Sequence, residues 1–247
     1  MGWHTSRSLR MTALSGALVL TLAGCASGAS QTPAPSVTAT VPSVTPSAVE
    51  DISASDVLDQ MDAAIAAATS VHLTGTIGTD SGPISVDIVG NKDGTVYSGT
   101  MSGETLGVAR YLRNAEGGWV LGDDTYWRTQ GASDTALGLM RDKWVPVDPT
   151  KVDLDSLAPF TYLQGLQELT VSDVGEVTRE AVGTIPAWKL PERASDTPGA
   201  LLVAADGTAL PLRVDLIEDG VQTWMAFDQW NEPVDVPSPS PDSIVNI

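Results

Sequence analysis

The sequence has little of what nucleophilic enzymes and metal proteins commonly use. Its 247 residues include one cysteine and two histidines, so it can form no internal disulfide and no zinc site built on several cysteines. His72 is the one histidine beyond residue 24, and no Gly-x-Ser-x-Gly or phosphate-loop motif occurs. A serine-hydrolase triad needs a histidine base beside its nucleophile. We therefore predict that the chain is not an enzyme and has no cofactor and no metal site.

Positive charge is also scarce. Lysine and arginine total 13 against 31 aspartates and glutamates, which gives a net charge of −18. Two of the arginines, Arg7 and Arg10, lie in the first 24 residues, so the rest of the chain carries −18 − 2 = −20. Such a surface repels phosphate backbones and anionic lipid headgroups. We expect no nucleic-acid partner and no membrane attachment through surface charge.

The chain begins with a pattern typical of an export signal. Residues 1–10 are polar and positive, and residues 11–23 are an apolar run too short to span a bilayer. Leu22-Ala23-Gly24-Cys25 follow and resemble a bacterial lipobox. The resemblance implies a signal peptide over 1–24 and acylation of Cys25 with palmitate-type chains, which would anchor the protein to the outer side of the cell membrane. An ordinary secretory signal with an incidental cysteine is the alternative.

The next segment predicts a stalk. Residues 26–48 are almost wholly Ser, Thr, Ala, Pro and Val without charge, too poor in large apolar side chains to offset the entropy of ordering. We therefore divide the mature chain into the lipidated cysteine and disordered stalk (25–49), a folded domain (50–235) and a C-terminal tail (236–247).

Hydrophobic periodicity predicts an α+β domain. Val57, Met61 and Ile65 recur every four residues after a capping Ser53, which indicates a helix over 54–69. Two more helices are expected at 133–143 and 153–169, and Asp206-Gly207 indicates a two-residue hairpin. Period-two alternation between turn residues predicts 10–11 antiparallel strands, near 71–77, 84–88, 95–102, 105–113, 118–122, 125–129, 171–179, 184–190, 200–205, 209–217 and 221–230.

Several stretches together resemble the actinobacterial lipoproteins related to LppX and LprG, which share a LolA/LolB-like half-barrel. After the lipobox and stalk, they are Ala66–Gly75, Tyr126-Trp127, Asp142–Val145, Gly183–Leu190, Ala205–Gly207, Leu210–Leu212 and Phe227–Trp230. The resemblance implies a strongly curved antiparallel sheet that wraps around helices. It also implies an apolar cavity that carries the acyl chains of a lipid or glycolipid through the cell envelope.

The apolar positions of two strands and one helix are the candidates for lining that cavity. They are Val71, Leu73, Ile84, Val86 and Ile88 on the strands and Leu157, Phe160, Leu163 and Leu166 on the helix. The same pattern is typical of a filled core. The function that the resemblance implies is a monomeric lipid carrier, held at the membrane through Cys25, with a transporter or envelope protein as a further partner. The alternative is a surface-displayed interaction module without an interior ligand.

Overall fold

The computed structural model describes residues 52–79, 81–147, 157–193, 199–218 and 221–245. Residues Ile52–Ile247 form one compact unit. The predicted signal peptide, the acylated Cys25 and the stalk lie outside the described residues, as do residues 153–156 at the start of the third predicted helix.

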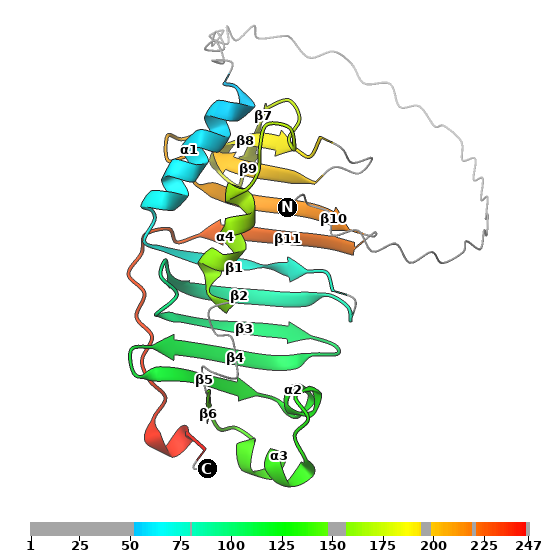
Figure 1. Cartoon of the computed structure of the whole chain (residues 1–247), viewed down its shortest axis with the longest axis vertical. Helices are drawn as coiled ribbons and strands as arrows, with labels where there is room; N and C mark the ends of the chain where they lie inside the picture. The colour runs from blue at the N-terminus through cyan, green and yellow to red at the C-terminus, as the bar shows by residue number, and fades with distance from the viewer. Residues whose placement is uncertain (1–51, 80, 148–156, 194–198, 219–220, 246–247) are drawn as a thin grey trace, which may run out of the picture. The chain divides into compact units, whose positions relative to one another are not determined.

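One antiparallel sheet of eleven strands dominates this unit (Figure 1), in the order β6-β5-β4-β3-β2-β1-β11-β10-β9-β8-β7. The first strand pairs with the last at the middle of the sheet, while β6 and β7 form opposite edges, so the sheet is open. This confirms the predicted α+β fold with a large, curved antiparallel sheet. The strands are β1 (Ser70–Ile77), β2 (Ile84–Asn91), β3 (Tyr97–Gly103), β4 (Gly107–Asn114), β5 (Gly117–Gly122), β6 (Val145–Pro146), β7 (Thr178–Val182), β8 (Ile185–Pro191), β9 (Ala200–Ala204), β10 (Pro211–Glu218) and β11 (Val221–Asp228).

Two helices lie on one face of the sheet (Figure 1), which we call the helix face; the opposite side is the open face. Helix α1 (Ala54–Ala67) begins at a capping box in which Ser53 and Asp56 satisfy each other's backbone N–H groups. It buries Val57, Leu58, Met61 and Ile65. Helix α4 (Pro159–Gln167) buries Phe160, Leu163 and Leu166 and packs on β1, β2 and α1. The 54–69 prediction is right to within two residues.

Three sequence predictions about helices need correction. The strand predicted at 125–129 is helix α2 (Asp124–Thr129), because the Asp123 side chain accepts a hydrogen bond from the Tyr126 N–H and caps a helical turn. The helix predicted at 133–143 is shorter, as α3 (Asp134–Met140). The helix predicted at 153–169 begins only at Pro159, a residue suited to a first helical turn, so Leu157 precedes it.

Two predictions about strands are also wrong. The strand expected at 171–179 begins only at Thr178, after a turn that Asp173 closes by accepting hydrogen bonds from the Thr170 backbone and hydroxyl. The two-residue hairpin at Asp206-Gly207 is a longer loop from Ala204 to Pro211. The Asp206 carboxylate accepts from the Thr208 N–H and hydroxyl, and that local turn replaces the tight hairpin.

The C-terminal segment packs on the open face at β4 and β5. Val236 is buried with Leu112 and Trp119, and the Asn114 side chain donates a hydrogen bond to the Val236 carbonyl at 2.9 Å. A short 3₁₀ turn (Pro241–Ser243, labelled η2) follows, where the Trp144 N–H donates to the Ser243 carbonyl at 2.8 Å. This segment therefore covers the open face at β4 and β5.

Candidate functional site

The helix face carries the predicted lining residues. Seven of the nine are buried, with exposed fractions between 0% and 9%, and Ile84 and Leu157 are half-buried. Val71, Leu73 and Leu163 expose nothing, so side chains fill the space around these three. The buried seven are Val71, Leu73, Val86, Ile88, Phe160, Leu163 and Leu166.

A tyrosine-rich part of this layer was not predicted from the sequence. Ile88 and the half-buried Leu157 pack in one cluster with Tyr97, Tyr111 and Tyr126. The Tyr111 and Tyr126 hydroxyls lie 3.4 Å apart, and burial raises the pKa of Tyr111 far above its usual range. The signal in the sequence was the alternation Tyr97-x-Gly99-x-Met101 and Ala109-x-Tyr111, in which the aromatic residues share the parity of the buried set.

Glycine lets α4 approach the sheet closely. A Cβ atom added at Gly90 would lie 2.9 Å from Pro159 Cδ and 2.6 Å from Tyr97 Cβ. A Cβ at Gly94 would lie 3.0 Å from that of Ala158. The first turn of α4 therefore rests directly on the backbone of β2 and of the turn that follows it.

The apolar layer continues toward the hairpin ends of the strands. Figure 1 shows α4 crossing the middle of the sheet, away from the end at which β1 joins β2. Toward that end lie five half-buried apolar side chains, which we call the apolar margin. They come from β10, β11, β1, β2 and β3, which are adjacent in the sheet. The members are Leu216, Met225, Ile77, Ile84 and Met101; only Ile84 was predicted as a lining residue.

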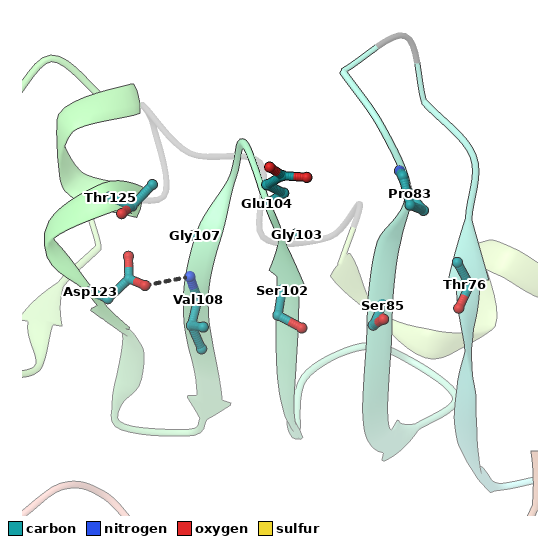
Figure 2. A pocket seen from close by; sticks show the side chains of 10 residues that line it. All are labelled: Thr76, Pro83, Ser85, Ser102, Gly103, Glu104, Gly107, Val108, Asp123 and Thr125. Carbon is teal, nitrogen blue, oxygen red and sulfur yellow. Dashed lines mark hydrogen bonds between the residues drawn. The ribbon is translucent and has the colours of Figure 1, made fainter.

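A polar pocket of about 680 Å³ lies on the open face (Figure 2). Its floor is one register row across four strands, with Thr76 opposite Ser85, Ser85 opposite Ser102, and Ser102 opposite Val108. Thr125 of α2 forms a further wall, and Pro83, Gly103, Glu104, Gly107 and Asp123 complete the lining. None of the nine predicted lining residues belongs to this pocket. An apolar sequence pattern cannot reveal this pocket, because alternate Ser and Thr residues on strands are usually a solvated face.

The wall formed by α2 is held in place by Asp123. Its Oδ1 accepts from the Tyr126 N–H at 2.7 Å and its Oδ2 accepts from the Val108 N–H at 2.9 Å, the bond drawn in Figure 2. Gly107 makes this close contact feasible, because a Cβ there would lie 2.4 Å from Asp123 Oδ1. The pocket thus has a fixed carboxylate at one side.

His72 lies on the open face between two carboxylates from neighbouring strands. Its Nδ1 is 2.6 Å from Asp228 Oδ1 on β11, and its Nε2 is 3.0 Å from Asp87 Oδ1 on β2. Partial burial lowers the pKa of His72, but hydrogen bonds and charge from Asp87 and Asp228 outweigh it, so the pKa is raised. A triad histidine needs one nitrogen for a nucleophile, and here both nitrogens face carboxylates.

Within the described ranges, no group of three histidine, cysteine, aspartate or glutamate side chains is arranged to hold a metal ion. Among the helices of the same residues, none has the length and hydropathy needed to cross a membrane.

No protein-family model matches the sequence, and no curated protein is significantly similar to it. Solved structures are similar to it. LprF from Mycobacterium bovis is 14% identical, with 74% of this chain and 95% of that chain covered, at a TM-score of 0.47.

The chain also resembles LppX. This Mycobacterium tuberculosis lipoprotein is 18% identical, with 75% of this chain and 100% of that chain covered, at a TM-score of 0.45. An uncharacterised Thermus thermophilus protein is 10% identical, with 78% and 98% covered, at a TM-score of 0.37. LppX is also one of the lipoproteins that the sequence motifs resemble.

Proposed function

We propose that the folded unit binds the acyl chains of a lipid or glycolipid on the helix face. The observation that carries this proposal is the apolar margin, which continues the buried layer with half-buried side chains on five adjacent strands. Each acyl methylene that such a surface removes from water contributes about 0.8 kcal/mol. A chain lying along Ile77, Ile84 and Met225 gains affinity without any attraction from surface charge.

Deeper binding requires α4 to move. Leu73 and Leu163 expose nothing, so an acyl chain that advances past the margin has to replace the side chains of α4 on the sheet. Helix α4 has no side-chain hydrogen bond at its N-cap, and its buried residues Phe160, Leu163 and Leu166 are all apolar. One apolar contact would replace another at little net cost.

The predicted signal peptide and acylated Cys25 lead us to expect that the protein acts at the outer side of the cell membrane. A protein anchored through acylated Cys25 and raised on a stalk would present this face outside the cytoplasm, near the bilayer that supplies the lipid. Transfer without bond formation accords with the position of His72, whose ring nitrogens are both taken by carboxylates. We expect a monomer that passes its lipid to a transporter or another envelope protein.

The part of the helix face that is filled by buried side chains favours a second candidate function. If the margin binds no chain, the domain is an interaction module displayed on the cell surface, with a core made wholly of its own side chains. Binding measurements on the helix face separate the two.

The test uses residues 52–247, because these contain the whole sheet and both covering helices as one compact unit. Cis-parinaric acid, a fluorescent fatty acid, is titrated into this unit, and native mass spectrometry examines the purified protein for copurified lipid. We expect uptake of the probe, weakened about tenfold by Ile84→Thr with Met225→Thr, since each change removes apolar contact area.

The matched control is Ile217→Thr, on the open face of β10 with 43% of its surface exposed. It should leave probe binding unchanged. A lipid-free mass together with no probe uptake would refute the carrier function and leave the interaction module.

A further inference from the structure

We propose that the pocket on the open face binds a neutral sugar. It lies on the opposite side of the sheet from the apolar margin, so a ligand bound there does not compete with an acyl chain. The lining combines free hydroxyls, two carboxylates and two small apolar surfaces.

Four hydroxyls line the pocket. Those of Thr76, Ser85 and Ser102 follow one register row on three adjacent strands, about 4.8 Å from strand to strand. Thr125 supplies a fourth from the α2 wall. Within the described part of the chain, none of these four hydroxyls forms a hydrogen bond to another protein group. Each can donate and accept a bond, as the hydroxyls of a sugar also do.

Charge decides which class of ligand fits. Glu104 and Asp123 bring two carboxylates to the lining, and no Lys, Arg or His belongs to it. Phosphates and other anions are therefore repelled, in a protein whose net charge is already −18. Sugar hydroxyls donate hydrogen bonds to carboxylates, and such charge-assisted bonds are stronger than neutral ones.

A bound cation is the competing occupant, and the geometry favours it less. Both Asp123 oxygens already accept backbone N–H groups at 2.7 and 2.9 Å, which leaves Glu104 as the one carboxylate of the lining without such bonds. The four hydroxyls are uncharged. Val108, 41% exposed, and Pro83 instead offer carbon surface, which suits the C–H face of a sugar ring.

The hydroxyl row ends beside a tryptophan whose ring is already covered. Trp224, opposite Thr76 on β11, has the Arg213 guanidinium 4.8 Å from its ring centroid, and Arg213 pairs with Asp215 at 2.7 Å. The tryptophan ring is thus already covered by a cation. Recognition in the pocket therefore comes from the hydroxyl row rather than from stacking on this ring.

The experiment measures saturation transfer by NMR to free sugars from the full-length chain, held in a detergent without a sugar headgroup. The neutral probes are maltose, cellobiose and mannobiose, with glucosamine as the cationic and glucuronate as the anionic comparison. We expect transfer to at least one neutral disaccharide and none to glucuronate. Ser85→Val with Ser102→Val should weaken that binding about fivefold for each hydroxyl removed.

The control variant is Ser98→Val, on the same strand and the same face as Ser102 but opposite Leu112, outside the pocket lining. It should bind the neutral sugar as the unaltered chain does. Three outcomes overturn the proposal: no transfer to any neutral disaccharide, equal binding by the Ser85/Ser102 variant, or stronger binding of glucosamine than of every neutral probe. None of them bears on the acyl-chain proposal, which is measured on the other face.

Discussion

The two faces of one sheet differ more than any two segments of the chain. Along β1, Val71 and Leu73 point to the helix face and are wholly buried, while His72 and Thr74, which alternate with them, are half-buried on the open face. Strand side chains alternate between faces, so neighbours in sequence have opposite environments. The helix face obtains its cover from α1 and α4, whereas the open face of β1–β3 carries hydroxyls and charges that water or a polar ligand can satisfy.

The largest effect is expected from truncating a leucine on a helix that covers the sheet, compared with a leucine on a helix that does not. Leu163 of α4 exposes nothing, whereas Leu139 of α3 exposes 69% of its surface. We expect Leu163→Ala to lower the free energy of unfolding by about 3 kcal/mol, because a buried leucine leaves a cavity. Urea denaturation of residues 52–247 measures it.

Leu139→Ala is the control and should change stability by less than about 0.5 kcal/mol, as surface substitutions do. If the two variants lost equal stability, α4 would not be a packed cover of the sheet. A small loss at Leu163 accompanied by stronger acyl-chain binding would instead show that α4 already separates readily from the helix face.

A second test concerns the contact between α4 and the sheet. Gly90→Ala would place a Cβ 2.9 Å from Pro159 Cδ and 2.6 Å from Tyr97 Cβ, so we expect a loss of about 2 kcal/mol from overpacking. Gly165→Ala, in α4 itself, meets nothing within 4 Å and should stabilise the unit by about 0.5–1 kcal/mol, since alanine favours a helix over glycine. Thermal unfolding of both variants measures whether each change raises or lowers stability. A lower stability of the Gly165→Ala variant would contradict the exposed helical position of Gly165.

The sequence allowed the helix face to be predicted far better than the open one. Val71, Leu73, Val86 and Ile88 stand out because apolar alternation on strands reports burial directly. That rule does not say what buries them. Whether the interior is open or filled depends on how closely α4 approaches, and this is set by Gly90, a residue without a side chain to give a signal.

The open face escaped prediction for a different reason. Thr76, Ser85 and Ser102 are far apart in sequence and ordinary as single residues, and only the register of two strand pairs makes them a row. The wall formed by α2 was also missed, because the apolar and aromatic residues of 125–129 predict a strand. The Asp123 side chain instead caps a helix there. Contacts between distant strands are set by topology, which local patterns do not encode.

The smallest expected effect lies in the middle of the open face, where His72 joins β1 to β2 and β11 through Asp87 and Asp228. These carboxylates raise the pKa of His72 above its unfolded value near 6.5. A raised folded-state pKa means that protonated His72 stabilises the fold fully below about pH 6.5 and that this contribution is lost as pH rises through the folded-state pKa.

His72→Asn should therefore destabilise the unit by about 1 kcal/mol at about pH 6 and by less at about pH 9. Urea denaturation of both proteins across that range measures the difference, with Thr74→Ala, on the same face of β1, as a pH-independent control. If the loss of unfolding free energy caused by His72→Asn instead grew with pH, His72 would be held in its neutral form. The open face would then disfavour charge at its centre, as the helix face does.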